Sequence, residues 1–270
     1  MMDQIEAKNM TISYGTYPII ENLNLHIPKG EITVLIGSNG CGKSTILRTL
    51  ARLLKPNNGS ILLAGEEIAH ISTKEIARRM SILPQGPNAP EGLTVEQLVK
   101  QGRYPHQSWL KQWSIQDEQA VQRALELTHM VELADRAVDS LSGGQRQRAW
   151  IAMTLAQGTD TLLLDEPTTY LDMTHQVEIL DLLFDLNERE GRTIVMVLHD
   201  LNLACRYAHH MIAVHNRGIY AQGRPEDIMT VENVQSVFEM RCQIARDPLF
   251  GTPMLIPYGK GRVLHEPLSV

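Results

Sequence analysis

Hydrophobic positions near the start of the chain follow two different periods. Residues 10–14 and the positions Leu23, Leu25 and Ile27 alternate with polar residues, as in half-buried strands, and residues 32–36 form an apolar run. A glycine-rich loop follows, and apolar side chains then recur at helical spacing until the break at residues 55–59. These helix positions are Ile46, Leu47, Leu50, Leu53 and Leu54. The pattern predicts strands, then a loop, then an amphipathic helix.

The rest of the chain alternates between strand and helix patterns, with one helical stretch between residues 87 and 157. Strands are predicted at 61–63, 80–83, 162–165, 193–198, 211–215 and 218–221. Helices are predicted at 94–101, 116–130, 174–189 and 231–238, with another beginning near Asp200. We therefore expect an α/β core that a helical insertion splits. The sequence gives the least structural information in the tail, which contains Pro248, Pro253, Pro257 and Pro267.

Composition narrows the class of protein. A chain of 270 residues with 43% hydrophobic content can bury a substantial core, and its net charge of −6 disfavours a nucleic-acid partner. Cys41, Cys205 and Cys242 contain no C-x-x-C pair, which favours a reducing cytoplasm over a disulfide or zinc framework. No stretch approaches the ~20 apolar residues of a spanning helix, and the amino terminus lacks a signal-peptide pattern.

The glycine loop matches the pattern G-x-x-x-x-G-K-S between residues 37 and 44. Because glycine has no side chain, the backbone N–H groups of the loop can surround phosphate oxygens, and the following helix directs its positive end at them. Lys43 adds a point charge, and Ser44 can bind Mg²⁺. With a strand before it and a helix after it, an incidental glycine turn is the weaker interpretation.

An acidic pair ends the apolar strand at residues 162–165. Asp165 is placed to hold Mg²⁺, and Glu166 follows it. Alone, the pair could equally be an ordinary helix cap. His199 after the next strand could likewise be structural, and His209, His210 and His215 lack a convincing metal-ligand spacing.

Between the loop and the acidic strand stands the pentapeptide Leu141-Ser142-Gly143-Gly144-Gln145. It resembles the signature of the ATP-binding subunits of ATP-binding-cassette (ABC) transporters, and the resemblance extends over nearly the whole chain. It implies an α/β P-loop NTPase (RecA-like) core with an antiparallel β subdomain and an inserted helical subdomain. Residues 1–86 and 158–270 would form the core, and residues 87–157 the helical subdomain.

The resemblance also implies roles for individual residues. Glu166 would act as the general base or as the group that positions the attacking water, and His199 would stabilise the γ-phosphate and orient that water. Gln85 would also belong to the catalytic residues and would sense a membrane subunit. Ser44, Gln85 and Asp165 would form the Mg²⁺ environment. Tyr14, with Tyr17 as a rival, would stack on adenine, and Asp172 would belong to the loop Tyr170-Leu171-Asp172. ATP would be held by Gly37, Ser38, Asn39, Gly40, Cys41, Gly42, Lys43, Ser44 and Thr45, and in trans by Ser142, Gly143, Gly144 and Gln145 of a second copy.

The implied function is ATP-driven transport. A single loop and signature without a membrane segment imply a homodimer at the cytoplasmic face of the inner membrane. It would act on separate integral membrane permease subunits and, indirectly, on a periplasmic or surface substrate-binding protein. Residues 92–95, 102–106 and 247–253 are similar to importers of ferric siderophores, haem and cobalamin, and favour siderophores. The alternatives are a soluble ABC-type ATPase acting on nucleic acid or ribosomes, and a degenerate scaffold, which intact Lys43, Glu166 and His199 disfavour.

Overall fold

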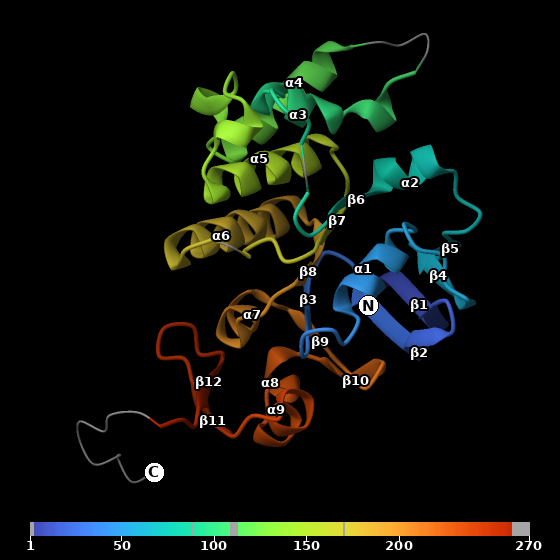
Figure 1. Ribbon diagram of the computed structural model, residues 1–270, viewed down its shortest axis with the longest axis vertical. Coiled ribbons are helices and arrows are strands. Elements are labelled where there is room, and N and C mark those ends of the chain that lie inside the picture. The colour runs from blue at the N-terminus through green and yellow to red at the C-terminus, as the bar shows by residue number, and fades with distance from the viewer. Residues whose placement is uncertain (1–2, 88, 109–112, 170, 261–270) are drawn as a thin grey trace.

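The main sheet of the protein has six strands in the order β10-β9-β3-β8-β7-β6 (Figure 1). A computed structural model describes residues 3–87, 89–108, 113–169 and 171–260. Five of the strands run parallel to their neighbours, and only the edge strand β10 pairs antiparallel, with β9. The six strands are β3 Ile32–Ile36, β6 Met80–Leu83, β7 Thr161–Leu164, β8 Thr193–Val197, β9 His210–His215 and β10 Gly218–Gly223.

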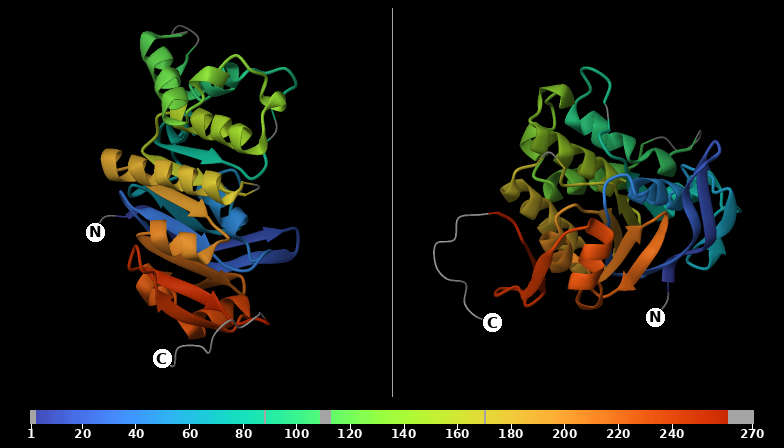
Figure 2. Two further views of the ribbon diagram at one scale, coloured as in Figure 1. Left: turned by 90° about the vertical axis from the view of Figure 1, so that its left-hand side faces the viewer. Right: turned by 60° about the horizontal axis from the view of Figure 1, so that its bottom comes forward.

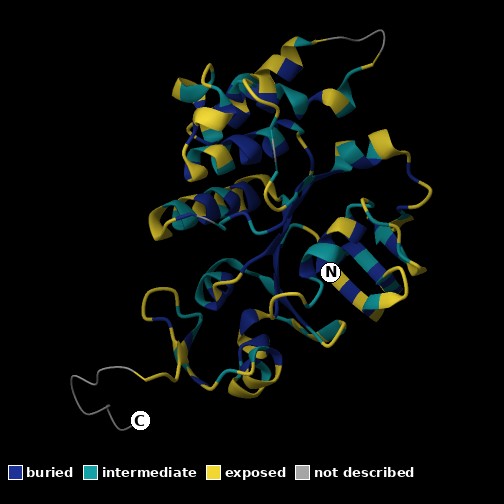
Figure 3. Ribbon diagram, in the orientation of Figure 1, coloured by how far each residue is buried: buried dark blue, intermediate teal, exposed yellow. Residues whose placement is uncertain are grey.

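The parallel strands are buried on both faces, which explains why their sequences are apolar runs rather than alternating patterns. Figure 3 shows the centre of this sheet as buried along its length. Successive residues face opposite sides: Val34 belongs to the core cluster on the helical side, whereas Leu35 belongs to the cluster on the other side. Figure 2 shows the resulting layers from two further directions.

A second, antiparallel sheet packs on one face of the main sheet, with helix α1 Lys43–Leu50 in the shared core. Its strand order is β2-β1-β4-β5. The strands are β1 Asp3–Tyr14, β2 Tyr17–Pro28, β4 Asn58–Leu63 and β5 Glu66–Glu67, and helix α2 Thr73–Arg79 leads from this sheet into β6. Apolar side chains from both sheets and from α1 bury one another here.

The segment between β6 and β7 is helical. It contains α3 Val95–Gln101, α4 Ile115–Leu127 and α5 Gly143–Ala156, with 3-10 turns η1 Tyr104–His106, η2 Val131–Leu133 and η3 Val138–Ser140. Reciprocal side-chain and backbone hydrogen bonds cap α3 through Thr94 and Gln97, and α4 through Ser114 and Asp117. A buried ion pair between Arg103 and Asp117, 2.8 Å long, ties the end of α3 to α4. The subdomain boundaries at residues 86/87 and 157/158 stay a prediction.

The remaining helices cover the other face of the main sheet and its β10 edge (Figure 1). They are α6 Met173–Glu190, α7 Leu201–Tyr207, α8 Pro225–Ile228 and α9 Val231–Phe238. A hairpin of β11 Cys242–Arg246 and β12 Pro253–Pro257 packs on α7. None of the helices that the structure describes is long and apolar enough to cross a membrane.

Several predicted boundaries differ from the structure. The helix predicted to extend to Leu54 ends at Leu50, and Leu53 is 58% exposed rather than part of its buried face. Arg52 takes a left-handed backbone conformation, with φ at 57°, and its guanidinium donates to the carbonyl oxygens of Ile68 and Ile71. These bonds hold the turn that ends the helix. The helix predicted to end at Met130 stops at Leu127.

Candidate functional site

Four neighbouring parallel strands end at one cleft. A cavity of about 460 Å³ opens beyond the carboxyl ends of β3, β8, β7 and β6. Each strand is followed by at least one residue that lines it: the glycine loop after β3, His199 after β8, Glu166 after β7 and Gln85 after β6. The lining residues are Ile19, Asn39, Gly40, Gly42, Lys43, Ser44, Thr45, Gln85, Glu166 and His199.

The loop needs glycine at two of its positions for steric reasons. Gly37 has φ at 148°, and a Cβ atom there would lie 2.3 Å from the carbonyl oxygen of Val214. Gly42 has φ at 105°, and its Cβ would lie 2.8 Å from a methyl carbon of Ile20. Side chains would therefore strain the turn that delivers the chain to α1. The turn leads directly into the amino terminus of α1, where backbone N–H groups can bind an anion.

Lys43 places its ammonium group inside the loop. The residue is 5% exposed, and its Nζ donates to the carbonyl oxygens of Gly37 and Ser38, each at 2.9 Å. The Sγ atom of Cys41 lies 3.8 Å from the same Nζ. A cation held among glycine backbone groups at a helix terminus matches the chemistry of a phosphate chain.

Ser44 and Asp165 bring together two oxygen ligands at the base of the cleft. The Ser44 hydroxyl donates to Oδ1 of Asp165 at 2.9 Å, and Asp165 is 3% exposed. Burial raises the pKa of Asp165, opposed by the hydrogen bond from Ser44. A hydroxyl beside a carboxylate is the type of donor set that Mg²⁺ prefers, so these residues fit that ion.

Glu166 is the centre of a row of hydrogen-bonded side chains. Its Oε1 lies 2.8 Å from Nε2 of His199, and its Oε2 accepts from Nε2 of Gln85 at 2.7 Å and from the hydroxyl of Thr169 at 2.9 Å. Burial acts to raise the pKa of Glu166, but the bonds from His199, Thr169 and Gln85 outweigh it. The pKa therefore lies below its ordinary value, so the carboxylate is ionised and able to accept a proton near neutral pH.

The pentapeptide lies outside this cleft. Ser142 caps α5 by accepting from the backbone N–H of Gln145 at 3.3 Å, while Oε1 of Gln145 accepts from the N–H of Ser142 at 3.2 Å. Gly143 begins the helix, and a Cβ atom on Gly144 would lie 2.6 Å from Cδ2 of His175. Ser142 and Gly143, at the amino end of α5, are both small and both exposed at the surface.

Two further predicted nucleotide contacts also lie away from the cleft lining. Asp172 is exposed and caps α6 by accepting from the N–H of His175 at 2.9 Å. Tyr14 is 50% exposed and pairs with Tyr17 across the turn between β1 and β2, whereas Ile19 of β2 lines the cleft. Tyr170 lies outside the described residues. The roles of Tyr14 and Asp172 stay predictions.

Three residues at or near these sites were not found from the sequence. Ile19 lines the cleft, Thr169 bonds to Glu166, and the ring of His175 touches the pentapeptide. Thr169, three residues after Glu166, could have been suspected because a hydroxyl at that spacing can return to the carboxylate. No sequence signal identifies the contacts of Ile19 and His175, which join segments far apart in the chain.

Comparisons with known proteins agree on one family. Residues 20–169 match the family model described as ABC transporter. The chain is 68% identical to the petrobactin import ATP-binding protein FpuD of Bacillus anthracis, over 100% of this chain and 98% of that protein. It is 51% identical to the ferric enterobactin transport ATP-binding protein FepC of Escherichia coli, over 95% of both chains. The solved dimeric structure of MJ0796, a bacterial ABC transporter cassette, has a TM-score of 0.73 at 28% identity, over 82% of this chain and 98% of that one.

Proposed function

Because this chain belongs to the ABC transporter family, we propose that it is the ATP-hydrolysing subunit of an importer for ferric siderophores. The membership confirms both the resemblance carried by residues 141–145 and the expected α/β P-loop fold class. The names of FpuD and FepC, an import and a transport protein, favour siderophores over haem and cobalamin. They also favour import over action on nucleic acid or ribosomes.

One observation supports the ATPase activity above all others. An ionised carboxylate, Glu166, is fixed between His199 and Gln85 in the same cleft as the phosphate loop and Lys43. The loop N–H groups and Lys43 would hold the phosphates of ATP, with the γ-phosphate facing this row. A base, a donor and an anion site in one cleft are the components that hydrolysis requires.

The side chains of the row would divide the chemistry. Glu166 would accept a proton from water as the water oxygen bonds to the γ-phosphorus, and the bond from phosphorus to the ADP oxygen would break. His199 would orient the water and donate to the γ-phosphate oxygens. Ser44 and Asp165, with Gln85 nearby, would hold Mg²⁺, which when bound supplies positive charge to the phosphate oxygens.

The residues away from the cleft would act across a dimer. Ser142, Gly143, Gly144 and Gln145 start a helix whose positive end suits the γ-phosphate bound by a second copy, with Asp172 beside it. We expect the dimer to dock on integral membrane permease subunits at the cytoplasmic face of the membrane. The permease would in turn receive cargo from a substrate-binding protein.

The phosphate-binding role is tested by Lys43→Ala. Removal of the buried ammonium should weaken ATP binding at least about tenfold, the loss expected for a charged hydrogen-bonding partner, and should abolish turnover. The exposed Lys29→Ala is the matched control and should change neither quantity. ATP titration and phosphate release measure both, and a Lys43→Ala protein that hydrolyses ATP normally would refute the assignment.

The dimer and the base are tested together by Glu166→Gln. ATP should still bind, turnover should fall by at least about 100-fold, and the protein should elute as a dimer in gel filtration with ATP and Mg²⁺. The reason is that the base is lost while the bridging γ-phosphate persists. Elution as a monomer at saturating ATP would contradict the proposed dimer.

A further inference from the structure

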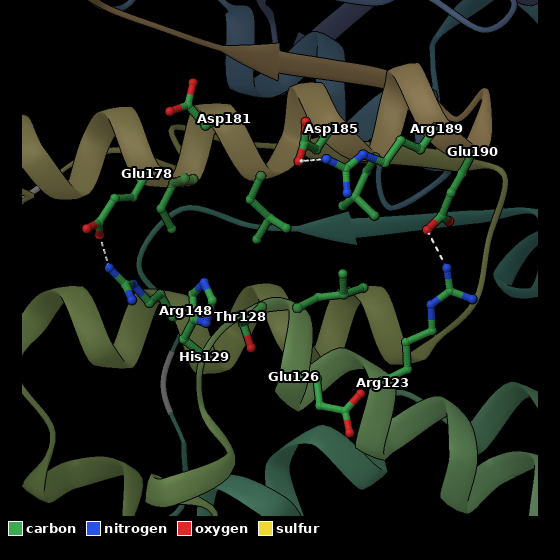
Figure 4. A pocket seen from close by; sticks show the side chains of 14 residues that line it. Arg123, Glu126, Thr128, His129, Arg148, Glu178, Asp181, Asp185, Arg189 and Glu190 are labelled. Carbon is green, nitrogen blue, oxygen red and sulfur yellow. Dashed lines mark hydrogen bonds and ion pairs between the residues drawn. The ribbon is translucent and has the colours of Figure 1, made fainter.

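Helices α5 and α6 lie side by side, with their amino ends together. A groove of about 970 Å³ separates α6 from α4 and α5 (Figure 4). Arg148 of α5 and Glu178 of α6 form an ion pair across one end of it, and Arg123 of α4 pairs with Glu190 at the other end at 2.7 Å. One turn before Arg148, Gly144 meets the ring of His175 on α6. The two contacts keep the amino ends of α5 and α6 together.

His175 touches both of the surface elements that the proposed dimer would present to the partner copy. Its backbone N–H donates to Oδ1 of Asp172 at 2.9 Å, and its ring Nδ1 lies 3.4 Å from the same oxygen. The ring Nδ1 also lies 3.7 Å from Oε2 of Glu178, which itself pairs with Arg148. Both carboxylates therefore lie at the Nδ1 edge of the ring.

The opposite edge of the same ring fills the space beside Gly144. A Cβ atom there would be 2.6 Å from Cδ2 of His175, a distance at which one of the two groups has to move. A Cβ atom at residue 144 would therefore displace the ring of His175 on the chain's own α6, independently of any nucleotide. The start of α5 rests on a ring whose position α6 sets.

We propose that His175 is a positioning residue that fixes the turn at residues 142–145 relative to Asp172. Both elements then reach the nucleotide of the partner copy as one unit, and the loss of the ring uncouples them. This inference rests on the proposed ATP-bridged dimer. It adds a residue that touches no nucleotide but determines how well the dimer closes.

A double-mutant cycle between Gly144 and His175 tests this coupling. Gly144→Ala, His175→Ala and the double variant are made in the Glu166→Gln chain, and the ATP concentration for half-maximal dimer formation is measured by gel filtration. Gly144→Ala should raise that concentration at least about tenfold, because the new methyl group displaces the His175 ring. Adding His175→Ala removes the ring and should recover most of this loss, so the effects of the two substitutions should not add. His175→Ala alone should raise it about threefold. His70→Ala, which also removes a histidine near a carboxylate, 3.6 Å from Glu67, is the matched control and should have no effect.

The outcomes separate this inference from the proposed function. If the Glu166→Gln chain itself does not dimerise with ATP, the proposed function fails. If it dimerises and the effects of Gly144→Ala and His175→Ala simply add, the positioning role of His175 is overturned. ATP binding to the monomer should be equal with and without His175→Ala, because this residue does not line the chain's own cleft.

A second pair of variants keeps the test valid if Gly144→Ala fails to fold. Arg148→Glu and Glu178→Arg should each weaken ATP-dependent dimer formation by reversing one charge next to His175. The double exchange should restore it, because the ion pair between α5 and α6 is re-formed with opposite polarity. No recovery in the double exchange would contradict a role for this α5–α6 contact.

Discussion

Glu166 has an uncommon backbone conformation for a residue with a side chain. Its φ angle is 54°, in the left-handed region, which costs about 1 kcal/mol or more for a residue other than glycine. The hydrogen bonds from His199, Gln85 and Thr169 hold the carboxylate in this turn. Strain of this kind, kept by surrounding contacts, is typical of a functional position.

Cys41 offers a selective chemical probe of the phosphate loop. It is only partly buried, whereas Cys205 and Cys242 are buried. Burial raises the pKa of the Cys205 thiol to about 12 and also raises that of Cys242, so both should react slowly. We expect iodoacetamide to label Cys41 first and to block ATP binding by its bulk beside Lys43. Mass spectrometry and ATP titration measure the two effects.

The control for this experiment is Cys41→Ala. That variant should bind ATP equally before and after iodoacetamide, because the two buried thiols are protected. Wild-type protein that is fully alkylated at Cys41 and still binds ATP normally would contradict the prediction.

At the scale of single residues, the sequence predicted which side chains belong to the cleft better than it predicted which of them bond to one another. Lys43, Ser44, Gln85, Glu166 and His199 were named in advance and line one cleft. Their mutual bonds were not foreseen: Gln85 was expected near Mg²⁺ and in the structure donates to Glu166. Which partner a side chain selects depends on strand order, which a local pattern does not contain.

At the scale of elements, Arg103 joins the helices between β6 and β7. Its guanidinium binds Asp117 at the start of α4 and the carbonyl oxygen of Ala156 at the end of α5, at 2.8 and 2.7 Å. Arg103→Ala would leave the buried carboxylate without its charged partner. We expect the free energy of unfolding to fall by about 3 kcal/mol, measured by urea denaturation.

Arg123→Ala is the matched control for this loss. Arg123 also pairs with a carboxylate, that of Glu190, but its side chain is 64% exposed. Its removal should cost less than about 1 kcal/mol, as for other surface ion pairs. Equal losses in the two variants would show that the Arg103 pair is not a structural anchor.

Elements with strong periodicity were predicted closely, and elements defined by their neighbours were missed. Helix α9 begins and ends as expected, and β6 does too. Helix α2 and the hairpin of β11 and β12 were not predicted. The hairpin is held by contacts with α7: the side chain of Asn202 exchanges hydrogen bonds with the backbone of Leu255, and Arg206 pairs with Asp247. Proline-rich sequence alone gives no sign of such partners.

For the whole molecule, the stability should fall at acid pH. Hydrogen bonds from Ser114 and Arg103 outweigh burial and lower the pKa of Asp117, and a backbone bond from Leu249 lowers that of Asp247. The pKa of Glu166 is lowered as well, whereas burial raises the pKa of Asp165. The unfolded chain binds more protons at the lowered groups, so they stabilise the fold above about pH 4, and this contribution is lost as the pH falls through their folded-state pKa values.

Urea denaturation at a series of pH values measures this effect. The free energy of unfolding of Asp117→Asn should be lower at pH 7 and should decline less on acidification, because one lowered carboxyl is gone. The control Asp185→Asn changes an exposed carboxylate of α6 and should keep the wild-type slope. An unchanged slope in Asp117→Asn would contradict the assignment.

The α/β architecture of the whole molecule could be predicted from the sequence, but the order of the strands in the sheet could not. Alternating strand and helix patterns predicted an α/β core split by helices, and the strands pair accordingly. The strand order β3-β8-β7-β6 is not sequential, and it alone determines that Glu166 lies between His199 and Gln85. Non-local pairing of this kind is not encoded in any local period.

That strand order also bears on how the protein can evolve. Neighbouring strands lie about 4.8 Å apart, so the lateral spacing of the reactive groups is inherited from backbone hydrogen bonding rather than from the connecting segments. The chain leaves the sheet after β6 and returns at β7, with the helices α3 to α5 between them. Insertions or deletions in the connection between α3 and α4 would therefore leave the lateral spacing of Gln85, Glu166 and His199 unchanged.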